Sequence, residues 1–201
     1  MEIKQDNAPV TNLLMMLIFI LSSISLYNER FFLKMILHPY SICKHKQYYR
    51  LLTSDLVHND FMHLLLNETM LFFVCGNLEG ELRGQSVYGS LQFLFIYLFS
   101  LFAGVLYTTI RRRNQFDFSS AGASGSILGC LMAFMILKPD KIAFYVPVFG
   151  GMKNMYVAFF YILILIWYQK RRDNEYIDQE LHFFGALGGI LATVLLFPDR
   201  I

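Results

Sequence analysis

Long apolar runs separated by short polar segments dominate the chain. Because a backbone inside a bilayer must satisfy its own hydrogen bonds, each run predicts a helix, and no period-two alternation indicates a membrane barrel. Crossing the hydrocarbon core takes roughly 17–25 apolar residues. Six runs come near that length: Val10–Leu26, Phe61–Leu78, Val87–Ile110, Ala121–Leu137, Met155–Gln169 and Leu181–Phe197. We therefore predict an all-α membrane protein, with six transmembrane helices in a single domain over residues 1–201.

Composition supports the membrane class. Hydrophobic residues make up 56% of the 201 positions and charged residues only 16%, against roughly 45–50% and about 25% in soluble domains. The net charge of +2 and the lack of a basic stripe argue against a nucleic-acid partner. The expected surroundings are therefore a lipid bilayer.

Cysteine usage indicates neither a disulfide framework nor a metal site. The three cysteines, Cys43, Cys75 and Cys130, form no pair with metal-ligand spacing. We expect no metal and no cofactor.

The run Val10–Leu26 resembles a secretory signal but is interpreted as a retained membrane helix. Glu2 and Asp6 offset Lys4, and no small-residue cleavage site follows before Asn28. A short chain without a targeting extension fits the cytoplasmic membrane of a prokaryote. Among the connections, the segment 27–60 is predicted to be a partly buried loop, and Lys138–Asn154 is rich in turn-forming residues.

Polar residues inside membrane runs are costly and are therefore functional candidates. His63 and Asn67 lie four residues apart in the second run, so they share a helix face and can direct donors at one point. Glu68 would point elsewhere, and its simpler reading is an interfacial or paired carboxylate.

A small-residue segment opens the fourth run. Gly122 and Gly125 flank Ala123–Ser124, which leaves room for a backbone to approach the Ser124 hydroxyl. A serine at a helix start also lies among unpaired N–H groups and the positive end of the helix dipole, as a developing oxyanion requires. The alternative is that these residues only allow two helices to pack closely.

The sixth run carries His182 with Gly185 and Gly189 on the same face. Small residues four apart let membrane helices approach closely, and Gly125 and Gly129 repeat this spacing in the fourth run. If the two glycine faces meet, His182 lies near Ser124. A neutral imidazole can take the proton of a serine hydroxyl, and no carboxylate is placed to orient it. The pattern predicts a Ser–His dyad, although an interhelical hydrogen-bonding histidine is the alternative.

These motifs resemble the rhomboid family of intramembrane serine proteases. Tyr49-Arg50 and the spacing His63-x-x-x-Asn67 resemble its aromatic-Arg pair and second-helix motif. Gly122-Ala123-Ser124-Gly125 resembles its nucleophile motif, and His182-x-x-Gly185-x-x-x-Gly189 resembles its last catalytic helix. The similarity runs from about Tyr48 to Phe197 in family order, and it implies a six-helix rhomboid bundle.

The resemblance implies a role for each motif residue. Ser124 would attack the scissile carbonyl and His182 would act as base and then acid, with His63 and Asn67 in the oxyanion hole. Further residues would support this site: His58 in the same polar pocket, Arg50 bracing the first loop, Glu79 organising the far end of the second helix, and Gly122, Gly125, Gly185 and Gly189. The substrates would be transmembrane proteins. One departure is Leu128, where the family commonly places an aromatic residue.

Orientation in the membrane, the alternative function and the oligomeric state stay open at this level. The loops on the side of the expected active site carry 11 of the 17 basic residues, and the positive-inside rule places that side in the cytoplasm. The usual bacterial rhomboid arrangement is the reverse, and we favour that arrangement.

A rhomboid-like pseudoenzyme that binds or escorts membrane proteins is the alternative function, and oligomeric state cannot be inferred. A transporter would show two similar halves, and none are found.

Overall fold

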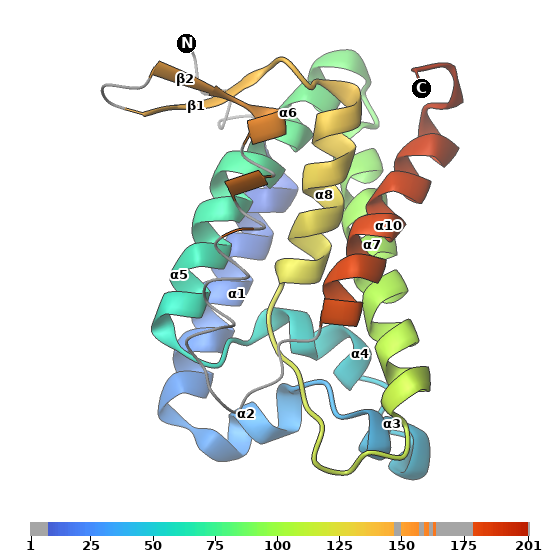
Figure 1. The fold of residues 1–201 in the computed structure, drawn as a ribbon. Helices are drawn as coiled ribbons and strands as arrows, with labels where there is room; N and C mark the ends of the chain where they lie inside the picture. Colours follow the sequence, from blue (N-terminus) through green and yellow to red (C-terminus); the bar gives the residue numbers. More distant parts are fainter. Residues whose placement is uncertain (1–7, 147–149, 157–158, 161–162, 164–178, 201) are drawn as a thin grey trace.

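A computed structural model describes residues 8–146, 150–156, 159–160, 163 and 179–200. Its described part is a bundle of helices with one small hairpin (Figure 1). Four described helical stretches are long and apolar enough to cross a membrane: α1 (Pro9–Tyr27), the stretch Phe61–Gln85, α7 (Gly89–Arg112) and α10 (Gln179–Leu196). A shorter apolar helix, α8 (Ser124–Leu137), lies among them.

Five of the six predicted runs therefore coincide with helices among the described residues. The fifth, Met155–Gln169, lies largely outside the described residues, so the predicted number of six stays a prediction. The mostly helical character is confirmed for the described residues, which include helices long and apolar enough to cross a membrane.

The second membrane helix is longer than predicted and is built from three segments. These are α5 (Phe61–Met70), a π-helical segment η3 (Leu71–Cys75) and α6 (Gly76–Gln85). The sequence predicted an end at Leu78 because polar residues follow. Glu79 is instead fully buried, where it accepts hydrogen bonds from the backbone N–H groups of Val10 (3.1 Å) and Thr11 (2.8 Å) at the start of α1. A carboxylate there satisfies orphan donors and complements the dipole of α1.

The first connection is more helical than predicted. It contains α2 (Glu29–Met35), α3 (Pro39–His45), α4 (Arg50–Thr53) and the 3-10 turn η2 (Ser54–Leu56). Figure 1 shows α2, α3 and α4 gathered at one end of the bundle. These elements are too short to be stable alone, so tertiary contacts must hold them.

Arg50 supplies such contacts. It is buried, and its Nη1 donates to the carbonyl oxygens of Leu33 and Ile36, both at 2.8 Å. Its Nε donates to Oε1 of Gln47 at 2.6 Å. The guanidinium thus ties α4 to the end of α2, since its planar fork serves several acceptors at once.

A two-stranded hairpin lies at the opposite end of the bundle (Figure 1). Strands β1 (Ile142–Val146) and β2 (Gly150–Lys153) are antiparallel, with Ile142 opposite Lys153. This is the region whose turn-forming residues were noted in the sequence. At the base of the hairpin, Lys141 pairs with Glu81 of α6 in the second membrane helix.

The main hydrophobic core lies between the second membrane helix, α7 and α8, and α10 packs closely against α7 and α8. Glycines permit this contact: a Cβ at Gly185 would lie 2.6 Å from the carbonyl oxygen of Gly125, and a Cβ at Gly189 would overlap the backbone of Gly129. The two glycine faces therefore lie against each other, as small residues spaced four apart allow. Real side chains at these positions would separate α8 from α10.

Candidate active site

Ser124 is the first residue of α8 and is 4% exposed. The segment before it is held by the first connection. Ser120 and Leu37 exchange backbone hydrogen bonds of 2.9 and 3.1 Å, and the N–H of Gly122 donates to the carbonyl of Ser54 at 2.9 Å. The start of α8 is thus fixed against loop helices, with its first N–H groups free of intrahelical partners.

His182 lies in the first turns of α10, and its Nε2 is hydrogen-bonded to Oγ of Ser124. The contact between the two glycine faces explains why Ser124 and His182 lie so close together. Gly125 lies within one helical turn of Ser124, and Gly185 lies within one turn of His182. The structure therefore brings together the serine and histidine that the sequence singled out.

His63 lies beside the segment that carries Ser124. A Cβ at Gly122 would lie 2.6 Å from Cε1 and 2.9 Å from Nε2 of the His63 ring. Gly122 also has φ +120°, a conformation that L side chains rarely adopt. Glycine is therefore required here twice, for the backbone and for the room that the imidazole occupies.

His58 connects the start of α8 to α1. Its Nε2 accepts the N–H of Ala123 at 3.4 Å, and its Nδ1 lies 2.9 Å from Oγ of Ser22. The Ser22 hydroxyl donates to the carbonyl of Leu56 at 3.2 Å, so the hydrogen between Ser22 and His58 belongs to Nδ1. Burial, with a smaller effect of His63, lowers the pKa of His58 well below its ordinary value, which favours the neutral imidazole.

Asn67 is 1% exposed and lies one turn after His63 in α5. Its Nδ2 donates to the carbonyl of His63 at 2.8 Å. An amide nitrogen carries two hydrogens, and this bond uses one. His63 and Asn67 thus share a helix face, as their spacing predicted.

Asp55, which is 3% exposed in the same region, was not predicted from the sequence. It accepts hydrogen bonds from Ser126 of α8 and Tyr97 of α7. These partners lie 71 and 42 residues away along the chain, so no local pattern indicates them. The only available signal was a carboxylate next to the apolar pair Leu56–Val57.

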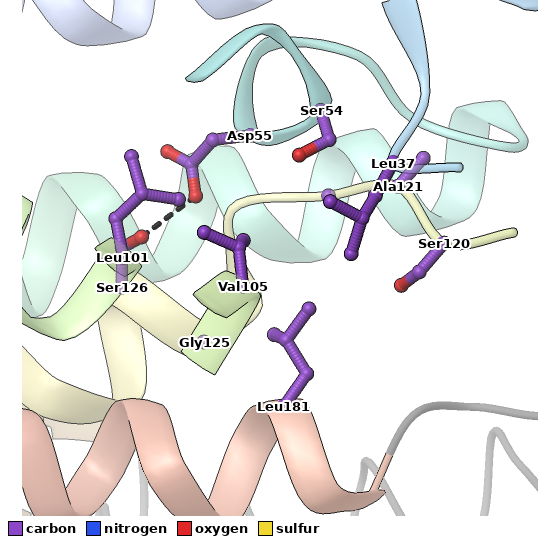
Figure 2. Close-up of a pocket in the computed structure, with 11 residues that line it drawn as sticks. Leu37, Ser54, Asp55, Leu101, Val105, Ser120, Ala121, Gly125, Ser126 and Leu181 are labelled. Carbon is purple, nitrogen blue, oxygen red and sulfur yellow. Dashed lines mark hydrogen bonds between the residues drawn. The ribbon is translucent and has the colours of Figure 1, made fainter. Parts of the chain in front are cut away.

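A pocket lies beside the start of α8 (Figure 2). Its lining is mixed, with Asp55, Ser54 and Ser126 on the polar part and Leu37 and Leu181 on the apolar part. Among the described residues, no group of three or more His, Cys, Asp or Glu side chains could hold a metal ion.

Comparison with known proteins shows the family of the chain. A family model described as the Rhomboid domain matches residues 45–199. The chain belongs to the rhomboid family. Two relatives come from Bacillus subtilis (strain 168). "Putative rhomboid protease YdcA" is 28% identical over 154 residues, which cover 77% of this chain and 70% of the relative.

The second relative, "Rhomboid protease GluP", is 30% identical over 156 residues. These cover 78% of this chain and 27% of the relative, so the chain spans about a quarter of that protein. Membership of the rhomboid family, together with the apolar helices, makes the chain an integral membrane protein of a protease family.

Proposed function

We propose that this rhomboid is an intramembrane serine endopeptidase that cleaves transmembrane protein substrates with a Ser124–His182 dyad. The observation that carries the proposal is the hydrogen bond between Oγ of Ser124 and Nε2 of His182 at the start of α8. A serine hydroxyl is a poor nucleophile until an adjacent base accepts its proton, and this pair has the geometry for that transfer.

The reaction follows the usual course of acyl transfer. Oγ of Ser124 attacks the scissile carbonyl while His182 takes the hydroxyl proton. The tetrahedral intermediate collapses when the same imidazole returns the proton to the leaving amine, which leaves an acyl-enzyme. Water then attacks the acyl-enzyme with His182 again as base, and Ser124 is released.

The negative charge of the intermediate is proposed to lie against the backbone N–H of Ser124, His63 and Asn67. The ring of His63 beside Gly122 and the remaining Nδ2 hydrogen of Asn67 support this assignment. Preorganised donors of this kind are each worth about 10²–10³ in rate. His58 is proposed to hold the preceding residue, Ala123, in position.

His182 is proposed to act without a carboxylate partner. Glu180, the carboxylate closest to it in sequence, lies 3.5 Å from Nε of Arg112 and 4.0 Å from Nε of Arg111. These ion pairs direct Glu180 toward the end of α7. A dyad rather than a triad is therefore the simplest description.

We infer the substrates and the location from the family. The two relatives are named as rhomboid proteases, which supports peptide-bond hydrolysis. We place the protein in the cytoplasmic membrane of a bacterium, with the site open to the side away from the cytoplasm. A non-catalytic rhomboid that binds membrane proteins is the second candidate, and the hydrogen-bonded Ser124–His182 pair disfavours it.

The test is cleavage of a panel of model transmembrane substrates by the purified protein in detergent. Ser124→Ala and His182→Ala are compared with wild type, and Ser119→Ala, which changes an exposed serine nearby, is the matched control. Cleavage by wild type and by the control alone supports the proposal. Substrate binding without cleavage by all four proteins would favour the escort function.

A further inference from the structure

A buried carboxylate lies directly beneath the first turn of α8. Oδ1 of Asp55 accepts a hydrogen bond of 2.6 Å from Oγ of Ser126, and Oδ2 accepts one of 2.5 Å from the hydroxyl of Tyr97. All three side chains are essentially buried. Figure 2 shows the Asp55–Ser126 bond at the wall of the pocket.

The three residues come from three different elements. Asp55 belongs to η2, Tyr97 to α7, and Ser126 to α8, where it follows Ser124 by two residues. One carboxylate therefore joins the first connection and the third membrane helix to the turn that carries Ser124. The free N–H groups of that turn move with Ser126, since they belong to the same rigid helical turn.

Burying a carboxylate at this position costs free energy. Burial disfavours its charged form and raises the pKa of Asp55 to about 6, although both hydroxyl donors oppose the shift. An apolar triplet of similar volume could hold the three elements together without this cost. Unlike apolar contacts, the two charge-assisted hydrogen bonds of the carboxylate are directional, so they fix the rotation of α8 about its axis.

We propose that Asp55 is a positioning residue for the Ser124 nucleophile, acting through Ser126 to hold the first turn of α8 in register with His182. The proposal rests on the protease function proposed above. Displacing a reacting group by about 1 Å can cost on the order of 100-fold in rate. A carboxylate that holds Ser126 therefore acts on catalysis without touching the substrate.

The competing interpretation is a purely structural anchor. In that case the bonds to Ser126 and to Tyr97 are equivalent, and losing either lowers stability without changing the chemical step. If Asp55 positions the nucleophile, only the bond to α8 bears on catalysis. The two hydroxyl partners thus provide a matched pair of variants.

The experiment measures kcat, KM and thermal stability for the full-length protein in detergent with one cleavable transmembrane substrate. The variants are Ser126→Ala, Tyr97→Phe, Asp55→Ala, Asp55→Asn and the double variant Asp55→Ala/Ser126→Ala. All rates are taken well below the melting temperature of each variant. We expect Ser126→Ala and Asp55→Ala to lower kcat about tenfold or more with little change in KM.

Tyr97→Phe should lower thermal stability but leave kcat close to wild type. The double variant should be no slower than Asp55→Ala alone, because both changes remove the same link. Asp55→Asn, which retains one acceptor oxygen, should recover part of the lost kcat.

A folded Ser126→Ala variant with wild-type kcat would overturn the assignment, as would equal losses of kcat in Ser126→Ala and Tyr97→Phe. If Asp55→Ala fails to fold, the comparison of these two variants still decides. Inactive wild type would instead refute the protease function from which the assignment starts, so the two failures are distinguishable.

Discussion

The backbone N–H of Ala123, the residue before Ser124, donates a hydrogen bond of 3.4 Å to Nε2 of His58. This bond ends a chain that starts in α1, since Nδ1 of His58 lies 2.9 Å from Oγ of Ser22. A membrane helix that supplies no residue to the dyad is thereby connected to the backbone on which the proposed nucleophile lies. The tautomer of His58 depends on the hydroxyl of Ser22.

Ser22→Ala is therefore expected to weaken the site from a distance. It leaves a buried Nδ1–H of His58 without an acceptor, which costs about 1–3 kcal/mol, and it loosens the segment before Ser124. A lower melting temperature and a lower cleavage rate in detergent are the expected results. The matched control is Ser23→Ala on the next position of α1, outside this chain. Equal behaviour of the two variants would contradict the connection.

The protonation of His58 should contribute to the pH dependence of stability. Its pKa is lowered well below its ordinary value of 6.5 in the folded protein, so below about pH 6.5 the unfolded chain binds a proton that the folded protein does not. Stability must then fall as pH decreases below that value, by up to about 1.4 kcal/mol per pH unit from this group. Denaturation of wild type and His58→Gln at pH 8 and pH 5 measures the effect.

Asp55 contributes with the opposite sign. Because its folded pKa is raised to about 6, its contribution to stability rises as pH decreases from about 6 toward 3.8. Since Asp55 is present in both proteins, the difference between wild type and His58→Gln isolates the histidine. The variant should lose less stability on acidification, and a larger loss in the variant would be inconsistent with a neutral, buried His58.

Gly185→Ala should separate α10 from α8. The new Cβ would lie 2.6 Å from the carbonyl oxygen of Gly125, a backbone atom that cannot move aside cheaply. We expect about 2–3 kcal/mol of destabilisation and loss of the Ser124–His182 hydrogen bond, hence of cleavage. Gly76→Ala in α6 is the control, since its Cβ would meet nothing closer than 3.8 Å. Both substitutions raise helix propensity equally. A loss of stability and cleavage in Gly185→Ala but not in Gly76→Ala would therefore show that the contact between α8 and α10 is responsible.

Glu79→Gln should affect stability far more than chemistry. The carboxylate satisfies the first N–H groups of α1 and also accepts from Oγ of Ser90 at 2.5 Å. Hydrogen bonds to charged groups contribute about 1.5–3 kcal/mol each, so melting should occur at a clearly lower temperature while the pH optimum stays unchanged. Glu81→Gln, which removes partly exposed ion pairs to Lys138 and Lys141, should have little effect.

Some elements could be predicted from sequence because their signal is local. The helices α1, α7 and α10 coincide with apolar runs whose length alone determines that they can span a bilayer. Ser124 and His182 were found because each lies at a helix start next to glycines spaced for close packing. For these features, composition, periodicity and the family motifs agree.

The structure of the first connection could not be predicted from local sequence patterns. Helices α2 to α4 depend on contacts such as the bond from Arg50 to the carbonyl of Leu33, 17 residues earlier. A segment of four to seven residues has too little intrinsic helix stability for its sequence to determine its structure. Asp55 was missed for the same reason, since both of its hydrogen-bond partners are distant in sequence. The base of the hairpin likewise meets α6 through Lys141 and Glu81, which lie 60 residues apart in the sequence.

The central claim, that Ser124 is a nucleophile activated by His182, is tested most directly by a serine-directed fluorophosphonate. Attack by Oγ forms an O–P bond and releases fluoride, so mass spectrometry of peptides locates the adduct without any knowledge of the substrate. We expect an adduct on Ser124 in wild type and almost none in His182→Ala when both proteins are equally well folded. An adduct on Ser120 or Ser126 instead, or undiminished labelling of Ser124 in His182→Ala, would contradict it.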